Sequence, residues 1–428
     1  MPLRIVTTNS GFESEPLGKP FGFKGGYMST MWQTAVWIRS EEGLHGLGLG
    51  TQNVLWSDPG VFTSTSESAG NSIMFAITDY ALRLARQTGF ETPVDLQEQI
   101  MDELYRYGKQ ITGLENLNKT FVLNALVPVD NAAWILYARS SGIRDFDTMI
   151  PEAWRGVFTH RHEKVASVPL SPYALKLDEI RKLVEQDGYF ILKLKLGSPG
   201  SQKEMLAWDK ARLEAVHNVI GGKSVAHTRD GKVPYYLDMN GRYENKETLR
   251  SLLDHADKIG AFDQIMVVEE PFPESYTVPV DDLGVMVVAD ESAHDAENVV
   301  ERVELGYGAI ALKPAAKTLS MTLKMAAAAQ KRNIPCFCAD LTVNPILVDW
   351  NKNVAARLAP LSGLDIGLLE TNGHQNYADW KRMMAYHPYA NASWIRSSGG
   401  VFHLDASFYE KSGGIFDDSD HYLNLVKL

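Results

Sequence analysis

The sequence has 428 residues, of which 45% are hydrophobic and 22% are charged, so it is long enough for two or three domains with buried cores. Its formal net charge of −11 at pH 7 argues against nucleic acid and anionic membranes as main partners, because both repel an acidic surface. An anionic small molecule would therefore need a local cluster of cations to bind.

Neither the first residues nor the apolar runs indicate export or membrane insertion. The segment MPLRIVTTNSGFESEP contains no apolar stretch typical of a secretory signal, and no apolar run reaches the ~18 residues of a membrane-spanning helix. The two cysteines, Cys336 and Cys338, stand two apart in a predicted strand, which suits core packing better than a disulfide. We therefore expect a cytoplasmic protein in a reducing environment.

The first third of the chain mixes strand and helix patterns. Residues 34–50 predict a β-hairpin, and the glycines of its second strand, GLGLG, do not fit a phosphate loop because no helix begins directly after them. Residues 57–72 are small and polar and predict a long loop, which is either a lid over a site or a plain surface segment. Three helices are expected next, at 73–88, 94–110 and 120–141.

From about residue 165, short apolar runs alternate with amphipathic segments. Eight runs predict strands, at 165–170, 189–196, 235–239, 264–270, 285–290, 309–313, 334–339 and 365–370. The helical segments between them include 201–219, 245–260, 295–305, 318–332 and 344–358. Eight strand–helix units favour an α/β fold with a closed (β/α)8-type TIM barrel, and an open doubly wound sheet is the alternative.

The same pattern predicts three segments. Residues 1–160 are expected to form an α+β capping domain, and residues 161–390 the barrel that carries the site described next. Residues 391–428 interrupt the strand–helix pattern and are expected to return to the capping domain.

Carboxylates end three successive predicted strands: Asp238 in YYLD, Glu269 in VVEEPF and Asp290 in VVAD. The carboxyl ends of barrel strands meet at one end of the barrel, where functional side chains gather. Three carboxylates there repel one another strongly unless a cation lies between them. Ligation by oxygen atoms alone favours Mg²⁺ or Mn²⁺ over zinc.

Lysines end the predicted strands on either side of these acids. Lys193 and Lys195 in LKLKLG share one face of their strand, as do Asp238 and Asn240, and Lys313 ends the strand IALK. A lone charge at such a position is most often a solvated strand terminus, but the ordered series of lysine, three acids and lysine weakens that interpretation.

The motifs LKLKLG, LDMNG, VEEPF, ADES and ALKPAAK, in this order and spacing, resemble the barrel of the enolase superfamily. The resemblance is to the mandelate racemase/muconate-lactonising enzyme family, and within it to the muconate-lactonising subgroup, which includes dipeptide epimerases. It extends to the hairpin WIRSEEGLHGLG and the helix VPVDNAAWILYARSSG. We take it to imply Asp238, Glu269 and Asp290 as Mg²⁺ ligands, with Glu269 preferred over Glu270.

The resemblance also implies a reaction. Lys195 and Lys313 would be the acid/base catalysts on opposite faces of the substrate α-carbon, and Lys193 would stay cationic and hold the substrate carboxylate. Removal of the α-proton would give an enediolate, whose added negative charge a divalent ion stabilises. Two bases allow racemisation or epimerisation, whereas one base suffices for cycloisomerisation. The implied partner is a small-molecule carboxylate, and relatives suggest a homo-oligomer.

The chain departs from the family at three places. Where relatives often have a Gly-Gly turn after the last lysine, it reads Lys317-Thr-Leu-Ser. The seventh strand leads into Asp340 and lacks the catalytic His of mandelate racemase, and the eighth ends at Glu370 without the Asp-x-Asp of dipeptide epimerases. Asn240, Asp340 and Glu370 are the candidate substrate-binding residues.

Other functions stay open. One is a sugar-acid dehydratase of the same superfamily, which the missing His disfavours. Another is a barrel aldolase with a Schiff base on Lys195 or Lys313, which leaves the three carboxylates unexplained. A third is a barrel that binds or assembles without catalysis. Specificity would reside in capping segments near 20–30 and 52–70.

Overall fold

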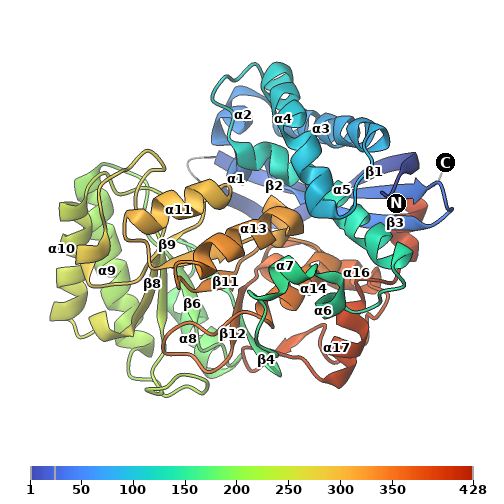
Figure 1. Ribbon diagram of the computed structural model, residues 1–428. Coiled ribbons are helices and arrows are strands. Elements are labelled where there is room, and N and C mark those ends of the chain that lie inside the picture. Colours follow the sequence, from blue (N-terminus) through green and yellow to red (C-terminus); the bar gives the residue numbers. More distant parts are fainter. Residues whose placement is uncertain (1, 24–25, 427–428) are drawn as a thin grey trace.

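The computed structural model describes residues 2–23 and 26–426, and it divides visibly into a smaller sheet-and-helix layer above a larger barrel (Figure 1). The smaller part contains an antiparallel sheet of order β1-β2-β3, with strands Ile5–Phe23, Gly26–Ser40 and His45–Gln52. Its main helices are α3 (Glu67–Gln87), α4 (Pro93–Thr112) and α5 (Lys119–Ser140). Two short helices, α6 (Phe146–Met149) and α7 (Glu152–Arg155), lead to the barrel.

The hairpin predicted at 34–50 is confirmed as β2 and β3, and its glycines serve packing against α5. A Cβ atom on Gly48 would lie 2.0 Å from the carbonyl oxygen of Pro128, and one on Gly46 would lie 2.1 Å from that of Ala132. Only glycine allows the helix backbone to approach the strand this closely. Helix α5 is apolar enough to span a membrane, but 94% of its 18-residue apolar window is buried inside the protein, as expected of a core helix.

The prediction of a long loop at residues 57–72 is wrong. The segment holds α2 (Pro59–Ser64), which follows α1 (Val54–Ser57), and the first turns of α3. Asp58 caps α2 by accepting from the backbone N–H of Val61, and Ser66 caps α3. The small polar residues that suggested a loop are therefore capping residues of two consecutive helices.

The barrel strands are confirmed close to their predicted places. They are β4 (Lys164–Val168), β5 (Leu170–Ser171), β6 (Leu192–Lys195), β7 (Tyr235–Asp238), β8 (Ile265–Glu269), β9 (Val287–Ala289), β10 (Ala309–Leu312), β11 (Cys336–Cys338) and β12 (Gly367–Glu370). Only Pro169 separates β4 from β5, and the two act as one strand. Because β4 pairs with β12 and β5 pairs with β6, all in parallel, the sheet closes on itself.

Alternate residues of each strand fill the barrel interior. This apolar group includes one or two residues from most strands, among them Ala166, Tyr236, Val267, Val288, Ala311, Phe337 and Leu368. Tyr236 and Phe337 meet across the interior with ring centroids 5.6 Å apart. Cys336 and Cys338, on the other face of β11, are free and buried among the residues under the helices, which confirms their packing role.

Helices follow most of the strands, as predicted. They are α8 (Leu177–Glu185), α9 (Gln202–Ile220), α10 (Lys246–Lys258), α11 (Ala296–Glu304), α12 (Pro314–Lys317), α13 (Leu319–Gln330) and α14 (Pro345–Ala355). Two short 3-10 turns, η1 (Phe262–Gln264) and η2 (Asp281–Leu283), flank β8. The expectation of eight complete strand–helix units is wrong at one link, because η2 alone stands between β8 and β9. The polar and proline-rich connection there leaves no amphipathic run long enough for a helix.

The carboxyl-terminal segment contacts both parts of the molecule. After α15 (Gly373–Asn376) and α16 (Trp380–Ala385), strands β13 (Ser397–Ser398) and β14 (Val401–His403) extend the barrel sheet antiparallel to β4. Helices α17 (Ala406–Lys411) and α18 (Asp420–Leu425), joined through η3 (Ser412–Gly414), follow, and His421 of α18 lies 2.9 Å from Glu13 of β1. The domain limits at 160 and 390 stay predictions.

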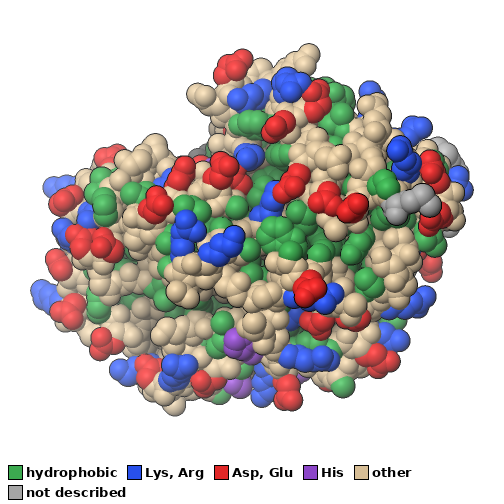
Figure 2. All heavy atoms as spheres, viewed as in Figure 1, with side chains coloured by type: hydrophobic (Ala, Val, Ile, Leu, Met, Phe, Trp, Pro, Cys, Tyr) green, Lys and Arg blue, Asp and Glu red, His purple; other side chains and the backbone are tan. Residues whose placement is uncertain are grey.

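Basic and acidic side chains are intermixed over the face of the molecule shown in Figure 2.

The close approach of α5 to β3 predicts the effect of adding one methyl group. We expect Gly48→Ala to destabilise the protein by about 1–3 kcal/mol or more, since the new carbon would overlap a helix carbonyl that cannot rotate away. Urea unfolding followed by circular dichroism measures this. Gly43→Ala, in the hairpin turn where a Cβ meets nothing within 4 Å, is the control; it carries only the strain of its positive φ.

A buried acid joining the two parts of the molecule predicts pH-dependent stability. Asp130 of α5 accepts from the backbone N–H and hydroxyl of Ser320 on α13, and burial raises its pKa from 3.8 to about 7. The folded state therefore holds this proton more tightly than the unfolded state, so stability falls as pH rises from about 4 towards 7. Between pH 5 and 8, the free energy of unfolding of the wild type should fall by on the order of 2 kcal/mol relative to that of Asp130→Asn, as measured by urea unfolding. If the difference between the two proteins stayed the same at every pH, the raised pKa of Asp130 would be wrong.

Candidate active site

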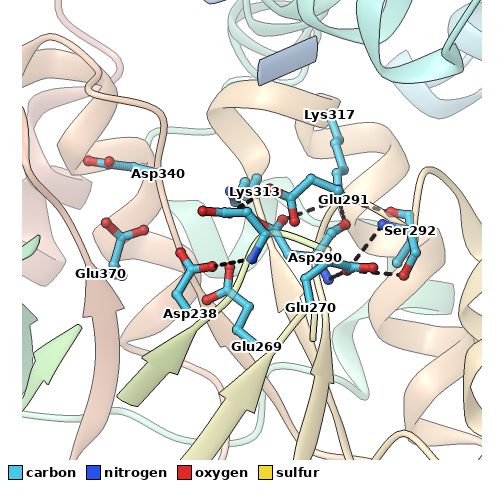
Figure 3. Close-up of polar contacts among 12 residues, drawn as sticks. Asp238, Glu269, Glu270, Asp290, Glu291, Ser292, Lys313, Lys317, Asp340 and Glu370 are labelled. Atoms are coloured by element: carbon cyan, nitrogen blue, oxygen red, sulfur yellow. Dashed lines mark hydrogen bonds and ion pairs between the residues drawn. The ribbon is translucent and has the colours of Figure 1, made fainter. Parts of the chain in front are cut away.

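The predicted site residues gather at the carboxyl end of the barrel. A single cavity is lined by Lys193, Lys195, Asp238, Asn240, Asp290, Lys313, Asp340 and Glu370. Glu269 lies in direct contact with this group and is fully buried. The nine residues come from seven different strands or the turns that follow them, so the closed sheet is what brings them together. Figure 3 shows how six of them lie: Asp238, Glu269, Asp290, Lys313, Asp340 and Glu370.

Lys193 is the central cation of the site. Its Nζ lies 3.0 Å from Asp238, 2.9 Å from Glu269 and 3.6 Å from Glu370, and only 4% of the residue is exposed. Burial alone lowers the pKa of Lys193, but the surrounding carboxylates outweigh it and hold the pKa well above its usual value. The surrounding carboxylates therefore favour the protonated form of Lys193, and its role in holding the substrate carboxylate stays a prediction.

Lys195 and Lys313 approach the acids from opposite sides. Lys195 donates to Asp238 at 2.6 Å and to the Asn240 side chain at 2.5 Å, whereas Lys313 lies 2.5 Å from Asp290. Their strands, β6 and β10, are separated by β7, β8 and β9 in the sheet order, which makes them opposite members of an eight-stranded ring. The row of acids thus lies between the two lysines.

Three carboxylates lie close enough to share one ion. One oxygen each of Glu269, Asp290 and Glu291 lies within 4.8 Å of the others, and all three residues are buried. Such a set of hard oxygen donors fits Mg²⁺ or Mn²⁺. Asp238, predicted as the third ligand, is turned towards Lys193 and Lys195, and its role as a ligand stays a prediction.

Sequence reasoning missed Glu291 because it follows Asp290 directly, and neighbours in a strand face opposite sides. Strand β9 ends at Ala289, so this alternation no longer applies at Glu291. Its Oε1 accepts from the Asn240 side chain at 3.0 Å, which directs it to the site. The only available signal was its place beside a predicted ligand.

Glu269 and Glu270 have different surroundings, as the sequence-based preference for Glu269 requires. Glu269 faces the barrel interior, where the hydroxyl of Tyr236 donates to it, and burial together with Asp238 raises its pKa well above the usual value. Glu270 adopts a left-handed φ of 39° and turns away. Its Oε2 accepts from the backbone N–H groups of Asp290 and Ser292 at 2.8 and 3.2 Å.

Asp340 and Glu370 stand apart from the cluster around Asp290 (Figure 3). Asp340 accepts from the backbone N–H of Thr342 at 3.0 Å, and burial and the nearby Glu370 raise its pKa to about 7. Glu370 accepts from the Asn372 side chain at 2.9 Å. Both line the cavity, so their geometry is compatible with the predicted substrate contacts.

The smaller part of the molecule closes the cavity. Phe21 of β1, Asn53 before α1 and Trp56 in α1 line it, so both segments expected to set specificity reach the site. Residues 24 and 25 of the first segment lie outside the described residues. The Trp56 ring faces the ammonium group of Lys313 at 4.4 Å from its centroid.

A family model and several solved structures are similar to this chain. Residues 177–371 match the family model described as enolase C-terminal domain-like. A search of curated proteins by sequence gave no match.

Solved structures resemble nearly the whole chain. A mandelate racemase/muconate lactonizing protein from Herpetosiphon aurantiacus has a TM-score of 0.65 at 18% identity, covering 95% of this chain and 97% of that one. A dipeptide epimerase from Enterococcus faecalis, complexed with Mg and a dipeptide, has a TM-score of 0.59 at 16% identity, covering 88% of this chain and 100% of that one. An N-succinyl Arg/Lys racemase from Bacillus cereus has a TM-score of 0.61 at 16% identity, covering 88% of this chain and 89% of that one. At these identities the similarity establishes the fold alone.

The contacts of Lys193 predict a large effect of removing its charge. Lys193→Met leaves three buried carboxylates without their shared cation, and breaking a buried ion pair in this way costs about 3–5 kcal/mol. Urea unfolding in the presence of a chelator measures the loss. Lys203→Met, at an exposed position on α9, is the matched control and should change stability by less than about 0.5 kcal/mol. Equal stability of the two variants would contradict the central role of Lys193.

Proposed function

We propose that this chain, which has the enolase superfamily fold and whose residues 177–371 belong to the enolase C-terminal domain-like family, is a racemase or epimerase that acts on a small-molecule carboxylate. The observation that carries the proposal is the placement of Lys195 and Lys313 on opposite sides of a row of buried carboxylates. Two such lysines can serve both faces of one carbon atom, which is what inversion of a stereocentre requires.

The acids would hold a divalent ion, for which we propose Mg²⁺, with Mn²⁺ as the alternative. Glu269, Asp290 and Glu291 provide the nearest oxygen atoms, and Asp238 is one strand away. When bound, such an ion offsets the negative charge that a carboxylate substrate gains as its α-proton leaves. The solved structures of a dipeptide epimerase with Mg and of a racemase with bound magnesium support this choice.

The lysines would move the proton. One must be neutral to accept it, and the other must be protonated to return a proton to the opposite face. In the described structure Asp290 raises the pKa of Lys313 against the effect of burial, which favours its ammonium form and suits it to donate. Lys193 stays cationic and would hold the substrate carboxylate. Phe21 and Trp56 would exclude water from the cavity.

Racemisation or epimerisation is favoured over the other reactions of the superfamily. The end of β11 carries Asp340 where a sugar-acid dehydratase would need a His, which disfavours that alternative. A Schiff-base aldolase would use one lysine as its nucleophile and would leave the buried carboxylates of Glu269, Asp290 and Glu291 without a role. Cycloisomerisation would need only one of the two lysines and stays the second candidate.

Solvent-deuterium incorporation tests the proposed function. We expect at least one member of a library of dipeptides, N-acylamino acids, muconates and sugar acids to exchange its α-proton in D₂O with Mg²⁺, as followed by proton NMR. EDTA should abolish the exchange, and added Mg²⁺ or Mn²⁺ should restore it. Exchange that persists without metal, or no exchange with any carboxylate in the library, would contradict the proposal.

The lysine variants distinguish two bases from one. For a racemase, Lys195→Ala and Lys313→Ala should each lose interconversion by at least a hundredfold, while each keeps α-proton exchange with only one of the two stereoisomers. Lys203→Ala should behave as the wild type. If one lysine proves dispensable for all exchange, cycloisomerisation becomes the better assignment.

A further inference from the structure

The turn between β9 and α11 carries two of the three clustered acids, Asp290 and Glu291. It belongs to neither a strand nor a helix, so the backbone groups of Asp290 to Ala293 need partners from elsewhere. The direction of both carboxylates depends on how this short turn is held.

Two buried side chains, the acid Glu270 and the base Lys317, hold the turn from two sides (Figure 3). Glu270 accepts from backbone N–H groups, those of Asp290 and Ser292. Lys317 donates to backbone carbonyl oxygens, that of Asp290 at 2.6 Å and that of Ala293 at 2.9 Å. Together they bind both kinds of backbone group that the turn presents.

The position of Lys317 is costly for the fold. The residue is 0% exposed at the end of α12, and a buried ammonium group is strongly unfavourable unless it is well paired. The next residue, Thr318, has φ 69° and ψ 154°, a conformation adopted almost only by glycine, which costs about 1–3 kcal/mol. The Thr318 hydroxyl accepts from the side chain of Gln97 on α4 at 3.1 Å and from the backbone of Met321 at 3.0 Å. The surrounding structure therefore maintains this strained turn.

We propose that Lys317 is a positioning residue, whose hydrogen bonds to the turn keep Asp290 and Glu291 directed at Glu269 so that the three can bind one divalent ion. Lys317 does not line the cavity and would not touch the substrate. The inference rests on the proposed metal-dependent function. It gives a role to a fully buried lysine beside the site that neither proton transfer nor substrate binding uses.

A competing explanation is that Lys317 only supplies positive charge among buried acids. Its Nζ lies 3.7 Å from Oδ1 of Asp290, so as a point charge it would repel an ion bound there. Removing that charge would then tighten ion binding. Loss of positioning has the opposite sign, since removing the groups that orient metal ligands typically weakens affinity about 10–100-fold. The sign of the change therefore separates the two explanations.

The experiment measures Mn²⁺ binding to the full-length protein by electron paramagnetic resonance, and Mg²⁺ by competition. Lys317→Met removes the charge and the donors, whereas Lys317→Gln removes the charge and keeps an N–H donor on a side chain one bond shorter. Lys331→Met, at an exposed position after α13, is the control for loss of one lysine. Circular dichroism melting in EDTA reports whether each variant is folded.

We expect about 10–100-fold weaker binding for Lys317→Met, an intermediate loss for Lys317→Gln, and no change for the control. Binding by either Lys317 variant that equals or exceeds that of the wild type would overturn the positioning role. If Lys317→Met does not fold, Lys317→Gln still separates the two explanations. The charge-only explanation requires Lys317→Gln to bind the ion more tightly than the wild type does, whereas the positioning role requires weaker binding. A wild type that binds no divalent ion would instead overturn the proposed function itself.

Discussion

The need to neutralise buried carboxylates at one end of the barrel dominates this structure. Asp238, Glu269 and Asp290 are each at most 1% exposed, at or just after the ends of three adjacent strands. Two like charges 4 Å apart repel by about 4 kcal/mol even at an effective dielectric constant of 20. Lys193, Lys195 and Lys313 are placed where they offset this repulsion, and each has a carboxylate within 3.0 Å.

Strand alternation explains how the sequence places these charges. In a closed barrel every second residue points inward, and the inward series of β6, β7, β8 and β10 each ends in a charged residue after apolar ones. A reader of the sequence can therefore locate Lys195, Asp238, Glu269 and Lys313 without coordinates. The order of the strands then makes the lysines opposite members of the ring. The eight strands and the principal acids were predictable for this reason.

The alternation ends where each strand ends, and so does its predictive value. Asn240, Glu270 and Thr342 follow strand ends with φ values of 45°, 39° and 64°, and these left-handed residues redirect the chain into its turns. Glu291 lies in a turn after β9, and Lys317 ends the short helix α12 that follows β10, so strand alternation reaches neither. The partners of Lys317 are backbone carbonyls, which leave no trace in the sequence pattern. The misread segment at 57–72 has a related cause, because Asp58 and Ser66 favour both loops and helix caps.

The cation–π contact between Trp56 and Lys313 links the smaller part of the molecule to a charged group of the barrel. Trp56 belongs to α1 in the smaller part, yet its ring centroid lies 4.4 Å from the Lys313 ammonium and 5.6 Å from that of Lys317. A desolvated cation over an indole face is stabilised by about 2 kcal/mol, and a neutral amine gains little of this. The indole thus adds to the effect of Asp290 in favouring the protonated form of Lys313. A side chain of the smaller part therefore bears directly on the charge of a lysine at the end of β10.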